Sequence, residues 1–460
     1  MMPSEPVRRL PRRGVAGLLV AAALAAAGPV AAQVRLPGAG LPSLGPMPSV
    51  LAPVPLPAPV ERAVRVPLQD LRRSVVATLL RNHPATLEAD PGGEPIVRGE
   101  LLLLSPQART LAAALAQGYR LLRESTLDGL DERSVVLAPP PGWSTALGLA
   151  QLRLHDPELD ADFNHIYTRS GTVAEGVAQA QAFAPPTDAV PPERPTSAAG
   201  AGRRIGLIDG GIDAAHPSLR HSLLRTWGCG SASVSSTHGT AVASLLVGRD
   251  AEFSGVAAGA TLHAADIYCG VATGGSAERV AEALAWLARE RVAVINISLV
   301  GPANRLLERA LVTLSGRGHL VVAAVGNDGP AAPPLYPAGY ATVIGVTAIA
   351  TTRRVLPEAA RGSHVAFSAP GADVAVARAG ASGYVVARGT SFASPVVAGL
   401  LADGLRDPEP AAARRAMQSL AGLAVDLGTP GRDDVYGWGL VGERARIAPA
   451  RVHASARLAD

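Results

Sequence analysis

The sequence predicts an α/β protein with a large, mostly parallel sheet and a smaller folded part before it. Two patterns support this prediction. Between residues 203 and 441, short β-branched runs alternate with helical patterns, which is typical of a parallel sheet covered on both faces by helices. Between residues 94 and 168 the predicted order is βαββαβ, a split βαβ module. The chain of 460 residues is also longer than one hydrophobic core normally supports.

In the small part, alternating or β-branched runs predict strands over residues 96–104, 119–123, 134–137 and 161–167. Helical patterns lie at residues 107–117, stopped by Gly118, and at residues 144–154, capped by Ser144. An amphipathic segment at residues 68–80 precedes them.

In the large part, five short apolar runs predict strands at residues 205–208, 261–267, 293–297, 320–325 and 341–346. Helical patterns lie between and after them, at residues 238–247, 277–289, 302–314 and 391–401. Because reactive groups of such sheets gather at the carboxyl ends of the strands, we expect the functional site there.

The N-terminus has the pattern of a secretory signal peptide. Four arginines at positions 8, 9, 12 and 13 precede an apolar run at residues 14–27, and small residues at 30–32 suit a signal peptidase. Residues 1–32 are therefore predicted to direct export, to a bacterial periplasm or out of the cell. The alternative is an uncleaved membrane anchor, although the run is shorter than the roughly 20 residues of a comfortable span.

The basic charge does not indicate an anionic partner. All 42 basic residues are arginine, and with 38 acidic residues they give a net charge of +4. Removal of residues 1–32 takes away four arginines and one glutamate, which leaves +1. Residues 203–441 carry 20 arginines and 18 acidic residues, so a nucleic acid partner is not expected.

Composition also marks the connecting segments. Residues 33–60 form a proline-rich spacer, residues 169–202 an Ala/Pro-rich linker and residues 442–460 a C-terminal tail. The small part spans residues 61–168. Cys229 and Cys269 are the only cysteines, and export would permit a disulfide between them; two separate buried thiols are the alternative.

Three short segments carry reactive side chains at strand ends or helix starts. Asp209 ends a predicted strand and is followed by Gly210-Gly211, His238 heads a helix in Thr-His-Gly-Thr, and Ser391 opens a helix in Gly-Thr-Ser-Phe-Ala-Ser-Pro. A hydroxyl nucleophile, an imidazole base and a buried carboxylate are the groups that acyl transfer needs. Asn327, at a strand end in Ala-Val-Gly-Asn-Asp-Gly, can supply a side-chain amide to an oxyanion hole.

These motifs, in the order Asp, His, Asn, Ser, make residues 203–441 resemble the subtilisin-like serine proteases, the S8 peptidase family. The resemblance implies a three-layer α/β/α fold. It implies Asp209 as the orienting carboxylate, His238 as the general base and acid, Ser391 as the nucleophile and Asn327 as the oxyanion donor. It further implies substrate binding by four residues: Ser298, Leu299, Val300 and Gly326. Family members usually carry glycine where Val300 stands, so this side chain should narrow a subsite.

The small part is similar to the ferredoxin-like prodomains of this family, which assist folding and inhibit the enzyme. Asn164 to Tyr167 resembles the prodomain tail that lies in the cleft, so we expect self-cleavage shortly after Tyr167 and trimming up to Arg203. An unrelated accessory domain that stays attached is the alternative. No cofactor or metal is expected for catalysis; structural calcium is common in the family, but no loop here identifies its ligands.

The sequence therefore predicts an exported serine endopeptidase, made as a self-processing precursor, that acts on proteins or peptides. The prodomain is its predicted intramolecular inhibitor, and the signal sequence its only predicted membrane contact. A catalytically silent relative that serves as a binding module is the alternative of another class. A broad degrader and a dedicated processing protease both stay open.

Overall fold

The computed structural model describes residues 68–169, 171–173, 202–230, 234–271, 274–450 and 452. The predicted signal peptide, the spacer and nearly all of the predicted linker lie outside these residues. Within the described part of the chain, no helix is long and apolar enough to cross a membrane.

A seven-stranded sheet forms the centre of the large part, and every pairing in it is parallel. Its order is β15-β14-β13-β11-β8-β10-β9. The strands are β8 (Arg204–Asp209), β9 (Leu223–Trp227), β10 (Thr261–Asp266), β11 (Val294–Ile297), β13 (Leu320–Ala324), β14 (Val343–Ile349) and β15 (Val365–Pro370). Nearly continuous apolar runs form the inner strands because both faces of a parallel sheet are buried.

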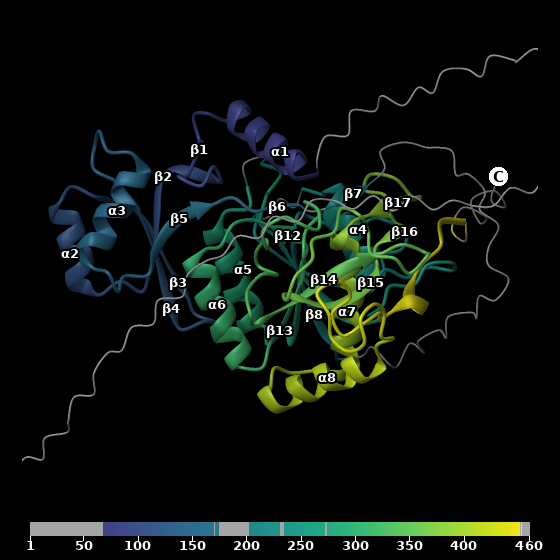
Figure 1. Ribbon diagram of the computed structural model, residues 1–460. Helices are drawn as coiled ribbons and strands as arrows, with labels where there is room; N and C mark the ends of the chain where they lie inside the picture. The colour runs from purple at the N-terminus through teal and green to yellow at the C-terminus, as the bar shows by residue number, and fades with distance from the viewer. Residues whose placement is uncertain are drawn as a thin grey trace, which may run out of the picture. The chain divides into compact units, whose positions relative to one another are not determined.

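Two layers of helices cover this sheet (Figure 1). On one face lie α4 (Thr237–Val247) and α7 (Thr390–Gly404), and on the other α5 (Ala277–Arg289) and α6 (Arg305–Gly316). Successive strand residues point to opposite layers: Leu207 packs with α4 and α7, whereas Ile208 packs with α5 and α6. The predicted three-layer α/β/α arrangement is confirmed.

The smaller module precedes this domain in the chain. Its elements are β1 (Leu87–Ala89), β2 (Pro95–Leu104), α2 (Ala108–Ala116), β3 (Arg120–Leu127), β4 (Glu132–Ala138), α3 (Thr145–His155) and β5 (Ala161–His165). The strands form one antiparallel sheet, ordered β1-β2-β4-β3, with β5 also paired to β2. Helix α1 (Leu68–Asn82) comes before them.

Strand β2 of the module is buried on both faces of its sheet over residues 101–104. Along β2, Leu101 and Leu103 belong to the module's own core beneath α2 and α3. Leu102 and Leu104 alternate with them and pack instead in the core that contains α5 and α6. Figure 1 shows α5 and α6 between the sheet of the module and the large sheet. The apolar alternation of one strand therefore joins the module to the large domain.

Several described elements were not predicted from the sequence. They are β9, β15, β16 (Ala372–Ala377), β17 (Tyr384–Arg388) and α8 (Pro410–Leu423). Helix α6 begins later than the predicted residue 302 because Asn304 caps it, with its side chain accepting the amide of Leu307. Residues 442–450, expected as a tail, contact the large domain: the carbonyl oxygen of Ile447 accepts the amide of Ala375.

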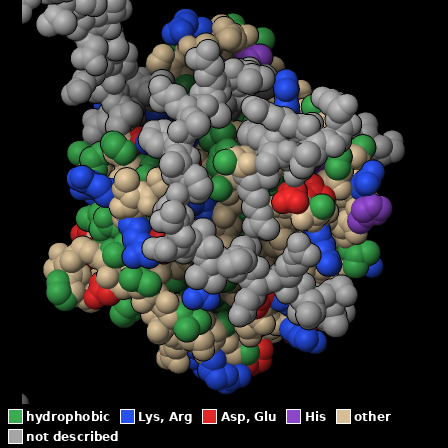
Figure 2. All heavy atoms as spheres, turned by 90° about the vertical axis from the view of Figure 1, so that its right-hand side faces the viewer, with side chains coloured by type: hydrophobic (Ala, Val, Ile, Leu, Met, Phe, Trp, Pro, Cys, Tyr) green, Lys and Arg blue, Asp and Glu red, His purple; other side chains and the backbone are tan. Residues whose placement is uncertain are grey.

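Charged side chains are dispersed over the surface. On the coloured part of the face in Figure 2, arginines stand apart from one another, with acidic and neutral side chains between them. This distribution on the coloured part of that face agrees with the small net charge of residues 203–441.

Candidate active site

Asp209 and His238 form a buried hydrogen-bonded pair at the carboxyl edge of the large sheet. Asp209 is the last residue of β8, and His238 is the second residue of α4. Nδ1 of His238 lies 2.8 Å from Oδ2 and 3.1 Å from Oδ1 of Asp209. Because a carboxylate only accepts, Nδ1 carries the donated proton and Nε2 is the basic nitrogen. Both residues are buried, Asp209 completely.

Glycines allow α4 to approach the end of β8 closely. The amide of Gly210 donates to Oδ1 of Asp209 at 2.7 Å and so orients the carboxylate. A Cβ atom on Gly239 would lie only 2.3 Å from the carbonyl oxygen of Gly210. Ser236 caps α4 by accepting the amide of Gly239 at 2.9 Å. A side chain at position 239 would therefore push His238 away from Asp209.

Ser391 is the buried second residue of α7, and it is tied to the strand segment beside it. Its hydroxyl donates to the carbonyl oxygen of Ser298 at 3.3 Å. In return, the hydroxyl of Ser298 donates to the carbonyl oxygen of Ser391 at 3.1 Å. In a regular helix the residue at position 395 would donate its amide to that carbonyl, but Pro395 has none. The proline thus explains why Ser298 holds the first turn of α7.

Asn327 follows β13 and faces the start of α7. Its Oδ1 accepts the amide of Thr390 at 3.1 Å, which fixes the orientation of the side-chain amide. Its Nδ2 lies 3.1 Å from the position that a Cβ atom on Gly389 would take. The donor group of Asn327 and the amide of Ser391 therefore lie near one another at the N-terminus of a helix. Two such donors can stabilise an oxyanion that forms at Ser391.

Two short segments of the same chain, residues 168–169 and 171–173, lie at this site. Strand β6 (Thr168–Arg169) pairs antiparallel with β12 (Leu299–Val300), and β7 (Thr172–Val173) pairs antiparallel with β17. Between them, a Cβ atom on Gly171 would lie 3.5 Å from Cβ of Ser391. Two short strands of the chain are therefore added beside the site, and Gly171 lies against Ser391.

Tyr167 anchors the amino side of this segment. Its amide donates to the carbonyl oxygen of Gly275 at 2.8 Å, and its own carbonyl oxygen accepts the hydroxyl of Tyr268 at 2.9 Å. Its phenol is buried and donates to the carbonyl oxygen of Pro302 at 2.7 Å. The segment is therefore held from two sides, by β12 and by the loop around Gly275.

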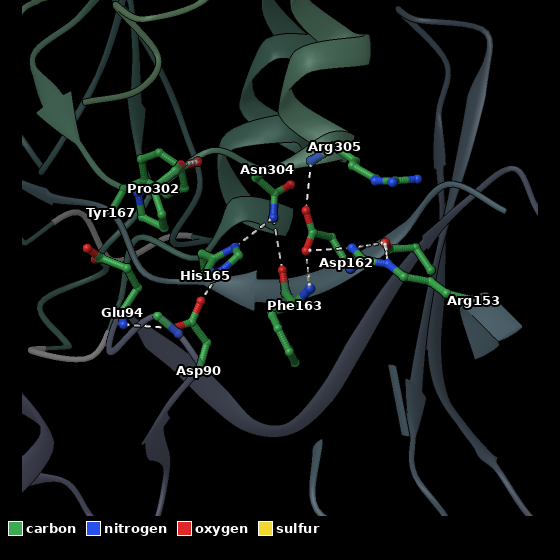
Figure 3. A network of polar contacts seen from close by, with 12 residues as sticks. Asp90, Glu94, Arg153, Asp162, Phe163, His165, Tyr167, Pro302, Asn304 and Arg305 are labelled. Carbon is green, nitrogen blue, oxygen red and sulfur yellow. Dashed lines mark hydrogen bonds and ion pairs between the residues drawn. The ribbon is translucent and has the colours of Figure 1, made fainter. Parts of the chain in front are cut away.

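The last strand of the module is attached to the start of α6 through Asn304 (Figure 3). Nδ2 of Asn304 donates to the carbonyl oxygen of Phe163 at 2.9 Å and lies 3.0 Å from Nδ1 of His165. Nε2 of His165 lies 3.3 Å from Oδ2 of Asp90 in the module. The amide of Arg305 donates to Oδ2 of Asp162 at 2.9 Å, which places a carboxylate at the helix N-terminus.

The predicted substrate-binding residues lie together in the described structure. Val300 is buried, and its Cγ1 lies 3.7 Å from the position of a Cβ atom on Gly326. Gly326 has a φ of +101°, a left-handed conformation that favours glycine. The Val300 side chain thus occupies space beside Gly326, which is consistent with the predicted narrowing of a subsite.

The two cysteines lie at the same edge of the sheet. Their sulfur atoms are 2.17 Å apart, a bonding distance. With Asp266 they form a group within 4.8 Å that could hold a metal by composition. Thiolates are the metal ligands, however, and sulfurs joined to one another do not supply them. The residues present therefore do not fit a metal centre while the sulfurs are bonded.

Sequence reasoning missed Asp266, Tyr268, Gly275 and Arg169, which all contribute to this region. Asp266 ends β10, next to Asp209 at the end of β8, and the two residues are register partners. The position of a carboxylate at a strand end was the available signal. Arg169 carried no local signal because only the pairing of β6 with β12 brings it to the site, and the contact of Gly275 with the amide of Tyr167 is likewise long-range.

The comparisons agree with this geometry. The model of the subtilase family matches residues 200–439, just over half of the chain. Minor extracellular protease Epr of Bacillus subtilis (strain 168) is 30% identical over 255 residues, which are 53% of this chain and 38% of that protein. The match thus spans less than half the length of that relative. Subtilisin Savinase of Lederbergia lenta is 32% identical over 252 residues, which are 54% of this chain and 91% of that protein.

Among solved structures, fervidolysin from Fervidobacterium pennivorans, a keratinolytic enzyme related to subtilisin, superposes with a TM-score of 0.62. It is 20% identical and covers 78% of this chain and 62% of that chain, which supports the shared fold. Because the family model matches residues 200–439, more than half of the chain, the chain belongs to the subtilase family.

Proposed function

We propose that the protein is an exported serine endopeptidase that cleaves its own chain at the peptide bond on the amino side of Gly171. Asp209, His238 and Ser391 form the catalytic triad in this proposal, and Asn327 is an oxyanion donor. One observation carries it: two short strands of the chain itself, β6 and β7, pair with β12 and β17 at this site, and Gly171 lies against Ser391.

The register supports this position of the scissile bond. Thr168 pairs with Val300 and Arg169 with Leu299, so the strand runs antiparallel to β12 as it approaches Ser391. Gly171 lies against Ser391 and Gly389: its Cα is 2.7 Å from the position of a Cβ atom on Gly389. A larger residue at either glycine would keep the peptide backbone away from the nucleophile.

In the proposed reaction, the Ser391 hydroxyl turns from the Ser298 carbonyl toward Nε2 of His238. Its oxygen then attacks the carbonyl carbon of the peptide bond that precedes Gly171. Nε2 accepts the hydroxyl proton, and Asp209 stabilises the resulting imidazolium through Nδ1. The carbonyl π electrons move to its oxygen, where Nδ2 of Asn327 and the amide of Ser391 stabilise the negative charge.

His238 then donates its proton to the leaving amine, the C–N bond breaks, and an acyl-enzyme ester remains on Ser391. Water attacks the ester with His238 again as the base, and a carboxylic acid and the Ser391 hydroxyl are released. Placing Ser391 at the start of α7 supplies an unpaired helix amide and a partial positive charge where the oxyanion forms.

The module at residues 87–165 acts as an inhibitor of the same chain until it is released. Its support is the interface described above: a shared apolar core, the Asn304 contacts and a charged contact. In this contact, Nε of Arg123 donates to both carboxylate oxygens of the buried Glu278, at 2.8 and 2.9 Å. Its other nitrogens bond Glu100. A product strand that stays paired with β12 would block other substrates.

Export and the disulfide belong to the same proposal. The pattern of residues 1–32 supports export, and the sulfur distance supports a Cys229–Cys269 disulfide in an oxidising compartment. Among the relatives, the Bacillus protein Epr is named an extracellular protease.

The test is expression of the full chain with Ser391→Ala, beside a Ser315→Ala control on α6. The parent and the control should yield a product whose N-terminus, by mass spectrometry, is Gly171 or a position produced by later trimming. Ser391→Ala should stay uncut. A fluorophosphonate probe should label Ser391 in processed protein. Processing of Ser391→Ala without other proteases, or correctly folded processed protein that takes no label, would contradict the proposal.

The processed protein from this test can also be used to measure how many different peptide sites the enzyme cuts. A dedicated processing protease should cut few sites in a denatured proteome, whereas a broad degrader should cut many. The side chain of Val300 beside Gly326 favours the narrower range, because it leaves less space for a bulky side chain.

A further inference from the structure

We infer that the subsite for the second residue before the scissile bond selects arginine or lysine, whose cationic end packs on the ring of Tyr268 and is attracted by the nearby buried carboxylate of Asp266. This selectivity rests on the proposed function, because it takes the residues before Gly171 as a bound substrate. It adds a substrate class: peptides with a basic residue at that position.

Arg169 shows the occupant of this subsite. It is the second residue before the proposed bond, and it pairs with Leu299 in the β6–β12 register. Its guanidinium carbon lies 4.5 Å from the centroid of the Tyr268 ring, within the range of a cation–π contact. The cationic end therefore lies over an aromatic face beside the catalytic residues.

Asp266 supplies the opposite charge. It is 6% exposed, and its Oδ1 accepts the amides of Tyr268 at 2.9 Å and Cys269 at 3.0 Å. Its Oδ2 has no hydrogen-bond partner among the described residues, although it is buried. A buried carboxylate oxygen without a donor is unfavourable unless a ligand or water satisfies it. The second oxygen of Asp266 thus has an unmet requirement for a donor.

The carboxylate and the guanidinium approach the same turn. Asp266, Tyr268 and Arg169 line one cavity of about 480 Å³ that also includes His238. A Cβ atom on Gly210 would lie 3.0 Å from Nη2 of Arg169, and one on Gly211 would lie 2.8 Å from Oδ2 of Asp266. Because Gly210 and Gly211 carry no side chains, the cavity stays open between the guanidinium of Arg169 and the carboxylate of Asp266.

Electrostatic effects on Tyr268 agree with this arrangement. Burial raises the pKa of Tyr268, the charge of Arg169 opposes that rise, and the carboxylates of Asp209 and Asp266 add to it. The cation and both carboxylates are thus within interaction distance of one ring. Asp209 is engaged by His238, so Asp266 is the carboxylate left to attract a substrate cation.

The test uses processed enzyme obtained from the full chain and octapeptides with the sequence of residues 166–173. The residue at the position of Arg169 is arginine, lysine, methionine or glutamate. Methionine matches the length of the basic side chains without their charge. We expect kcat/KM for arginine and lysine to exceed that for methionine at least tenfold, with glutamate lowest. Raising the salt from 0.1 to 1 M should reduce the ratio, because the Debye length falls from about 10 to about 3 Å.

The variant Asp266→Asn tests the assigned carboxylate. Asparagine keeps an Oδ1 that can accept the amides of Tyr268 and Cys269, so it removes the charge with little change of shape. The arginine-to-methionine ratio should fall below about threefold. The control is Asp407→Asn, which removes a charge bonded to Arg204 at the opposite end of β8 and should keep the parent ratio.

Active-site labelling separates the two levels of failure. If the probe labels Ser391 and all peptides are cut with an arginine-to-methionine ratio near one, the basic subsite is wrong and the proposed protease stands. If the parent prefers arginine and Asp266→Asn keeps that preference, the assignment to Asp266 is wrong. If neither labelling nor cleavage occurs, the proposed function and the subsite fail together. The parent comparison needs no variant, so it decides the selectivity even if Asp266→Asn does not fold.

Discussion

Replacing Arg123 by methionine should destabilise the precursor in a pH-dependent way. The Glu278 side chain is 5% exposed beneath the module and accepts two hydrogen bonds from Nε of Arg123. Burial raises the pKa of Glu278 above its ordinary value of 4.5, and Arg123 opposes that rise. Without Arg123, Glu278 must either stay charged without its partner or take up a proton.

The proton uptake sets an upper limit on the loss of stability. Protonating a carboxyl group whose unfolded-state pKa is 4.5 costs about 5 kcal/mol of free energy at pH 8 and about 1 kcal/mol at pH 5. Since the folded-state pKa is raised, the loss is small below 4.5 and grows as the pH rises. The Arg123 side chain is 41% exposed, so water screens the contact. We therefore expect Arg123→Met to lower the free energy of unfolding by roughly 2 kcal/mol at pH 8.

The assay is thermal unfolding of the full chain in a Ser391→Ala background, which prevents self-cleavage. Arg123→Met should lower Tm by about 2–3 °C at pH 8 and by about 1 °C or less at pH 5. Adding Glu278→Gln should reduce the pH dependence, because only Glu100 is then left without Arg123, and Glu100 still accepts a hydrogen bond from Nδ2 of Asn164. Equal losses at both pH values, or a pH dependence that Glu278→Gln leaves undiminished, would refute the reasoning.

Two further predictions concern the oxyanion donor and the cysteines. Asn327→Ala should lower kcat by about 10²–10³-fold with little change in KM, since the lost donor acts on the transition state. Steady-state kinetics measure both constants, and an unchanged kcat would show that Asn327 is not an oxyanion donor. Replacing Cys229 and Cys269 together by serine should lower the free energy of unfolding by up to about 4 kcal/mol, because the bond closes a loop with a sequence separation of 40. Denaturant unfolding measures this, and an equal midpoint for parent and variant would contradict the disulfide.

The parts of the fold that the sequence predicted correctly are those that depend on local patterns. The buried strand β8 is a continuous apolar run, and α5 alternates apolar and charged residues with a helical period and is capped by Ser276. The strands β15 and β16 were missed because they are rich in alanine, a poor strand former, and contain the polar residues Ser368 and Asp373. Their strand structure depends on pairing with β14 and β17, which is not a local property.

The residues of the site also divide into those predictable from local motifs and those that depend on long-range pairing. Asp209, His238 and Ser391 lie in motifs whose small residues are needed locally, as the close approach of Gly239 to Gly210 demonstrates. By contrast, the role inferred for Arg169 depends on the register of a two-residue strand against β12. A shift by one residue would turn its side chain to the opposite face and place a different residue over Tyr268.

Substrate selectivity in this protein therefore depends on which residue of an extended strand faces a fixed carboxylate. Asp266 is held by its own strand and by two backbone amides, whatever segment is bound. The backbone pairing with β12 is independent of side chains, so any extended peptide could form it. In the inferred subsite, the buried carboxylate of Asp266 near one position of that strand distinguishes between peptides, because it attracts a cationic side chain and repels an anionic one. For this reason, we expect the Arg169-containing segment to be cut faster than the same segment with methionine there.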